Sequence, residues 1–189
     1  MSVVPMDEKE LNAWIQGCRR GDSVAQYEMY RKLYGYAHHI CSRYTGNSFE
    51  TEEAIQDGFL KVFTKIEKYS GELSFLAWFK VIFIHTCIDR YRSKLTDAPE
   101  LGLEEAEGLS CPPEYLVNAE AEHLLALVQL LPPAYRLCFN MFAIEGYGYQ
   151  EIADMIGISI GTVKSNISKA RAQLKNMISQ DQKAYHHGK

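Results

Sequence analysis

Apolar side chains recur at every third or fourth position along most of this chain, which is the spacing of one buried face of an α-helix. In the first half, the pattern predicts helices over residues 11–18, 23–40, 51–67 and 74–94. The apolar run at residues 81–84 would by itself also fit a strand. No other segment shows the alternation of apolar and polar residues that a half-buried strand requires, so the pattern favours an all-α fold.

The second half of the chain predicts four further helices, over residues 121–131, 134–144, 149–156 and 159–178. Pro132 and Pro133 end the first of them, because proline cannot continue a helix interior. Only Gly157 and Ile158 separate the last two helices. The chain must turn steeply there, as it does in a helix-turn-helix.

Prolines and acidic residues divide the chain into two blocks. No proline lies between Pro5 and Pro99, and none follows Pro133. Residues 94–123 carry one basic and eight acidic side chains, and little in this segment could form a core. We therefore expect two small helical domains, at residues 1–94 and 118–180, joined by an acidic flexible linker at 95–117 and followed by a polar tail at 181–189.

The composition excludes several classes of protein. No apolar stretch approaches the roughly 18–20 residues that span a bilayer, and the first residues lack the features of a secretory signal. The five cysteines are an odd number with no C-x-x-C pair, which argues against a disulfide scaffold or a zinc knuckle. His38, His39 and Cys41 lack the remaining ligands of a metal site. We expect a reduced, cytoplasmic protein without metal or cofactor.

The residues of the helix-turn-helix segment suit a DNA-reading motif. Ala153 is small where the two helices approach, Gly157 can adopt the left-handed conformation that ends a helix, and Ser159 can cap the next one. The net charge is −4, yet residues 124–189 carry seven basic and four acidic side chains. The polar face of the last helix offers phosphate and base contacts through Thr162, Lys164, Ser165, Asn166, Ser168, Lys169 and Arg171. The alternative is an ordinary solvated amphipathic helix.

A second motif overlaps the same segment. Residues 157–161 match G-x-S-x-G, the nucleophile elbow of serine hydrolases, and Asp181, His186 and His187 follow in the order of a catalytic triad. That elbow requires a strand before the serine, whereas residues 149–156 have a helical pattern. We therefore do not expect this segment to be a hydrolase active site.

Three segments together resemble the bacterial extracytoplasmic-function (ECF) sigma factors of the sigma-70 superfamily. They occur in the family's order, at residues 52–63 (EEAIQDGFLKVF), 75–79 (FLAWF) and 149–171, which holds the helix-turn-helix. The resemblance implies a sigma region 2 domain at 1–94 and a sigma region 4 domain at 118–180. It also implies a subunit that binds core RNA polymerase and directs promoter-specific transcription initiation at −35 and −10 DNA elements. Such a subunit is not an enzyme and has no catalytic residues of its own, because RNA synthesis belongs to the polymerase.

The resemblance assigns roles to individual residues. Segment 52–63 is similar to the polymerase-binding helix, with Glu53, Gln56, Asp57 and Lys61 on its polar face. The −35 element would be read by the seven polar residues of the last helix. Aromatic residues such as Phe75 and Trp78 could stack on unpaired bases, although at helical spacing they are more often core. The −10 element would be contacted by Gly71, Glu72, Leu73, Ser74, Phe75, Lys80 and His85.

Four positions depart from the family pattern. Gly58 costs its helix up to about 1 kcal/mol, and it would either loosen docking or allow a closer approach. Val81 and His85 stand where the family commonly has arginine and asparagine. Asn166 stands where many relatives have arginine, and because asparagine pairs well with adenine, we hypothesise an adenine contact in the −35 box.

Family members are commonly held inactive by an anti-sigma factor, so such a partner is expected besides core polymerase and promoter DNA, with no direct membrane insertion. An alternative hypothesis is a two-domain regulator that senses a ligand or dimerises and binds duplex DNA without polymerase. Segments 52–63 and 75–79 argue against it. The five cysteines could sense redox state, but cysteine is more often a small buried residue.

Overall fold

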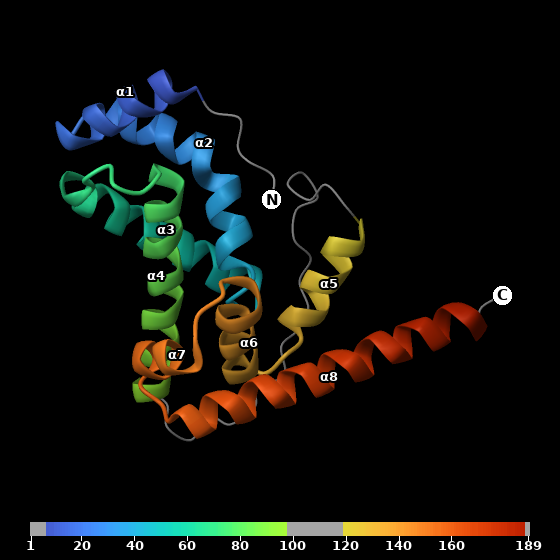
Figure 1. The fold of residues 1–189 in the computed structure, drawn as a ribbon. Helices are drawn as coiled ribbons and strands as arrows, with labels where there is room; N and C mark the ends of the chain where they lie inside the picture. Colours follow the sequence, from blue (N-terminus) through green and yellow to red (C-terminus); the bar gives the residue numbers. More distant parts are fainter. Residues whose placement is uncertain (1–6, 98–118, 188–189) are drawn as a thin grey trace.

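The computed structural model describes residues 7–97 and 119–187, and Figure 1 shows them as helices joined by short connections. The first domain contains α1 (Glu8–Arg19), α2 (Ser23–Cys41), α3 (Ser48–Lys65), η1 (Ile66–Lys68) and α4 (Phe75–Asp97). The second contains α5 (Ala119–Gln129), α6 (Pro133–Phe139), the π-helical segment η3 (Asn140–Ile144), α7 (Tyr149–Ile156) and α8 (Ile160–His187).

Within those described ranges there is no strand, so the predicted all-α class and the four-helix helix-turn-helix domain are confirmed. The expected linker at 95–117 lies mostly outside the described residues. Two predicted boundaries differ from the structure: α4 continues to Asp97, and α8 continues through most of the expected polar tail to His187.

The start of α3 also differs from the prediction. Asn47 caps the helix, and its side-chain Oδ1 accepts a hydrogen bond from the Glu50 amide at 2.8 Å. Thr51, where the sequence pattern predicted the helix to begin, is buried one turn inside the helix and donates its hydroxyl to the Asn47 carbonyl oxygen at 2.9 Å. Asparagine and threonine are both good capping residues, so residue type alone did not distinguish them.

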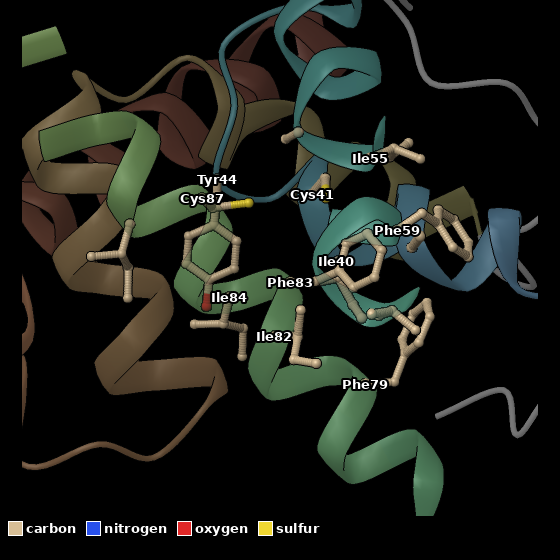
Figure 2. Packing of buried hydrophobic residues seen from close by; sticks show 14 of the residues in the cluster. Ile40, Cys41, Tyr44, Ile55, Phe59, Phe79, Ile82, Phe83, Ile84 and Cys87 are labelled. Atoms are coloured by element: carbon tan, nitrogen blue, oxygen red, sulfur yellow. The ribbon is translucent and has the colours of Figure 1, made fainter. Parts of the chain in front are cut away.

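Stacked and edge-on aromatic rings fill the core of the first domain. The Phe79 and Phe83 ring centroids lie 4.4 Å apart on α4, and the Phe59 ring from α3 meets both edge-on. Figure 2 shows the three rings gathered between α3 and α4. Ala54, Ile55, Phe59 and Val62 are all buried and form the inward face of α3.

Gly58 allows α3 and α4 to approach each other closely. A Cβ atom at this position would lie 2.3 Å from Cε1 of Phe83, far inside van der Waals contact. The structure therefore gives Gly58 a role in the packing of α3 on α4. Glycine lowers the stability of α3 itself, but the Phe83 ring packs in the space that a larger side chain would fill.

The four cysteines in the described residues are buried free thiols: Cys18, Cys41, Cys87 and Cys138. Burial, together with the negative charge of Asp22, raises the pKa of Cys18 to about 11. A thiol with a raised pKa is protonated at neutral pH and reacts slowly with oxidants. The fifth cysteine, Cys111, lies outside the described residues.

We predict that Gly58→Ala lowers the free energy of unfolding by about 1–3 kcal/mol, because the added methyl group overpacks the core against Phe83. Urea unfolding followed by circular dichroism measures the change. Gly161→Ala is the matched control: its Cβ would lie 3.6 Å from Ser159 Oγ, in ordinary contact. The control should stabilise its helix by up to about 1 kcal/mol. Equal effects of the two substitutions would contradict the packing argument.

Candidate nucleic-acid interface

The turn between α7 and α8 has the geometry that its residues predicted. Gly157 ends α7 in the left-handed conformation, with φ of 83°. Ser159 Oγ then accepts a hydrogen bond from the Thr162 amide at 3.0 Å, which caps the start of α8. Behind the turn, Ile152 and Val163 are fully buried and hold the two helices together.

Helix α8 presents six of its seven predicted polar residues to solvent. Val163, Ile167 and Ala170 face the core of the domain. Side chains on the opposite face carry three positive charges and three hydroxyl groups, which can bind phosphates and base edges. The exposed residues are Thr162, Lys164, Ser165, Ser168, Lys169 and Arg171.

Asn166 is the exception, and its expected place on the exposed face is wrong. It is 9% exposed and its side-chain amide donates a hydrogen bond to Cys138 Sγ of α6 at 3.6 Å. The reason is its register: Asn166 lies three residues after Val163, on the same buried stripe of α8. Its amide is therefore used inside the domain rather than being offered to a base.

A stacked pair of aromatic rings that sequence reasoning missed supports two of the basic residues. The Phe142 and Tyr149 rings stack with an interplanar angle of 6° and a centroid separation of 4.8 Å. Lys164 Nζ lies 5.5 Å from the Tyr149 ring centre, and Arg171 Cζ lies 5.2 Å from that of Phe142. Such contacts contribute about 0.5–1 kcal/mol each at exposed sites. The rings thus restrain two cations on the polar face of α8.

The residues expected to contact the −10 element differ in their exposure to solvent. Gly71, Glu72, Leu73, Ser74 and His85 are exposed in and after the loop before α4. Phe75, in contrast, is 3% exposed and packs against Tyr69 and Trp78, so its assignment to the DNA surface is corrected to a core role. The Lys80 ammonium forms an ion pair with Glu145 of the second domain.

The polar face of α3 is largely paired with α4. Arg90 binds the carboxylates of both Glu53 and Asp57, and Lys61 Nζ lies 2.8 Å from Asp89 Oδ2. Gln56 is the exposed member of the four predicted residues. The carboxylates of Glu53 and Asp57 remain 41% and 46% exposed, so a partner can still reach this face.

The hydrolase motif does not form an elbow. The residues before Ser159 are helix α7 rather than a strand, and the Ser159 hydroxyl is used to cap α8. In the described part of the chain, no helix has the length and apolar character needed to cross a bilayer.

Comparison with known proteins gives two matches that follow the two domains. Residues 29–95 match sigma-70 region 2, and residues 121–174 match sigma-70 region 4. The ECF RNA polymerase sigma factor SigE of Mycolicibacterium smegmatis is 27% identical over 185 residues, covering 93% of this chain and 70% of that protein. SigW of Bacillus subtilis is 26% identical over 177 residues, covering 87% of this chain and 94% of that one.

A solved structure shares the fold. It is the sigma factor RpoE in complex with the anti-sigma factor NepR from Bartonella quintana, with a TM-score of 0.52 and 18% identity. The match covers 81% of this chain and 96% of that chain.

Together, a region 2 domain and a helix-turn-helix region 4 domain define a transcription initiation factor of the sigma-70 class, not an enzyme. The chain belongs to the ECF sigma factors of that superfamily. As a sigma factor, it binds core RNA polymerase and directs promoter-specific initiation through −35 and −10 elements.

We predict that Asn166→Asp destabilises the second domain by about 1–3 kcal/mol, because it buries a carboxylate that cannot donate to Cys138. Thermal unfolding measures the loss. Ser165→Asp adds the same charge at the neighbouring exposed position and should change stability by no more than about 0.5 kcal/mol. A similar, small effect at both positions would show that Asn166 is on the surface after all.

Proposed function

We propose that the exposed face of α8 reads the −35 element of the promoters that this sigma factor recognises. The observation that carries the proposal is the agreement of three features on one face: a capped helix start, six exposed polar residues and two cations held against stacked rings. The residues assigned to this surface are Thr162, Lys164, Ser165, Ser168, Lys169 and Arg171. Asn166 is assigned to the packing behind it.

The first domain serves the other two tasks in this proposal. The loop at 71–74, with Lys80 and His85 on α4, contacts the −10 element. The polar face of α3 binds core polymerase through Gln56, which is free, and through Glu53, Asp57 and Lys61, whose intramolecular ion pairs are partly exposed. Exposed ion pairs contribute little stability, so exchanging them for contacts with polymerase costs little.

We further propose that the protein acts in the cytoplasm and is held inactive by an anti-sigma factor. Support for the partner comes from the RpoE structure, which contains NepR. Core polymerase, promoter DNA and that anti-sigma factor are then the partners of this chain.

Run-off transcription with purified bacterial core polymerase tests the proposal. Genomic fragments should give discrete new transcripts only when both the core enzyme and this protein are present. The proposal is contradicted if no transcript appears and the protein does not associate with core polymerase. Tight binding of the free protein to duplex DNA would then favour the alternative hypothesis of a ligand-sensing regulator.

We predict that Lys164→Ala and Arg171→Ala each weaken holoenzyme binding to a −35 element and reduce the slope of log K against log salt concentration by about 1, because each removes a phosphate-binding cation. Fluorescence anisotropy at several salt concentrations measures the slope. Lys175→Ala, one turn further along α8 and also exposed, is the matched control and should leave the slope unchanged. A slope that is identical in all four proteins would remove these residues from the interface.

A further inference from the structure

The loop before α4 is held in place by two side chains of the first domain. Arg19, the last residue of α1, donates from Nε to the Ile66 carbonyl oxygen at 3.4 Å and from Nη2 to that of Tyr69 at 2.6 Å. The last carbonyl groups of a helix have no partner within it, and a planar guanidinium can donate to two acceptors at once. Arg19 therefore fixes the point where η1 ends and the chain enters the loop at residues 70–74.

The Tyr69 side chain connects the start of this loop to its end. Its hydroxyl donates a hydrogen bond to the Leu73 carbonyl oxygen at 2.8 Å. Its ring lies edge-on to that of Phe75, with the centroids 5.4 Å apart, and its centroid is 5.3 Å from that of Trp78. Because Phe75 and Trp78 belong to the first turn of α4, Tyr69 holds both the backbone of the loop and the helix that follows.

The residues between these two anchors also have a defined conformation. Gly71 has a φ of 84°, in the left-handed region that favours glycine. Ser74 Oγ accepts a hydrogen bond from the Ala77 amide at 3.3 Å, as a capping residue does at a helix start. Glu72 is exposed, and Leu73 is 60% exposed although its side chain is apolar. The loop thus combines a restrained backbone with side chains that remain in solvent.

Helix α1 is a rigid support for Arg19. Gly17 lets α2 approach α1 closely, since an added Cβ atom would lie 2.4 Å from that of Ala25. Figure 1 shows the turn between α1 and α2 beside η1 and the loop that follows it. The match to sigma-70 region 2 covers residues 29–95, so the helix that carries Arg19 lies outside the matched segment.

We propose that Arg19 and Tyr69 are positioning residues for promoter melting, which hold the loop at 70–74 in the conformation that receives one unpaired base of the −10 element. The inference rests on the proposed −10 role of residues 71–74. A base that leaves the duplex loses its stacking and pairing. If the loop also had to become ordered at that moment, the cost would be subtracted from the affinity. Arg19 and Tyr69 order the loop before DNA arrives.

Backbone ¹⁵N relaxation of the free full-length protein tests the positioning without DNA. In wild type, the amides of residues 71–73 should have order parameters of about 0.85, the value of rigid backbone. Tyr69→Phe keeps the ring but removes the hydroxyl, and Arg19→Met keeps an apolar stem but removes both donors. Each should lower these order parameters to below about 0.6, the range of flexible backbone.

Two further variants separate positioning from a general loss of stability. Arg19→Lys keeps the charge and can donate to one of the two carbonyl groups, so its order parameters should lie between those of wild type and Arg19→Met. Tyr34→Phe is the matched control, because it removes a tyrosine hydroxyl that donates to Glu52 in the same domain. It should leave the order parameters of the loop unchanged.

Binding of the holoenzyme to single-stranded DNA tests the effect on base capture. The probe is the non-template strand of a −10 element mapped by run-off transcription, and companion probes each lack one base. Wild type should lose affinity most when the base held by the loop is missing. Tyr69→Phe and Arg19→Met should bind the intact probe about fivefold more weakly, yet bind that abasic probe as tightly as wild type does. Such coupling between residue and base does not arise from a general loss of stability.

Two results would overturn the proposal. Order parameters at residues 71–73 that are equal in wild type, Tyr69→Phe and Arg19→Met would exclude positioning by these side chains. Equal changes in affinity for the intact and abasic probes would leave both residues with a purely structural role. If wild-type holoenzyme instead binds every abasic probe as tightly as the intact one, the proposed −10 role of the loop fails, and the relaxation data judge the positioning separately.

Discussion

The turn that follows α2, at residues 42–45, is the constraint on which the arrangement of the two domains depends. Buried carbonyl groups need hydrogen-bond donors, and those of Ser42, Arg43 and Thr45 obtain them from Gln129, Asn140 and Arg136 of the other domain. This single contact brings Glu145 to Arg43 and Lys80, and it sets α7 against α4.

Within the first domain, a rigid aromatic core connects the two surfaces that we propose bind different partners. Gly58 on α3 receives the Phe83 ring of α4, and Phe59 and Phe79 complete the packing. The α3 face proposed to bind polymerase and the α4 side proposed to contact DNA therefore keep a fixed relation to each other. Rigid helices position binding residues better than loops do. The second domain obtains the same effect from the stacked rings beneath Lys164 and Arg171.

Sequence patterns predicted what depends on local interactions. The helices, the left-handed Gly157 and the Ser159 cap follow from residue type and spacing, and all three are present. The burial of Asn166 could also have been predicted, because this residue lies on the same helix face as Val163 and Ile167. It was assigned to the exposed face because its side chain is polar. The contacts of Arg136 and Glu145 could not be predicted, since their partners in the first domain lie about 65 to 100 residues away in sequence. A tertiary contact of this kind leaves no periodic signal.

Hydroxyl-radical footprinting of one promoter fragment tests the central claim most directly, because it reports both DNA contacts in a single experiment. The account predicts two protected segments, centred about 25 base pairs or roughly 85 Å apart, that appear only when this protein and core polymerase are both present. Permanganate should also detect unpaired thymines at the downstream segment. Protection of one compact duplex site by the free protein, unchanged by polymerase, would contradict the account.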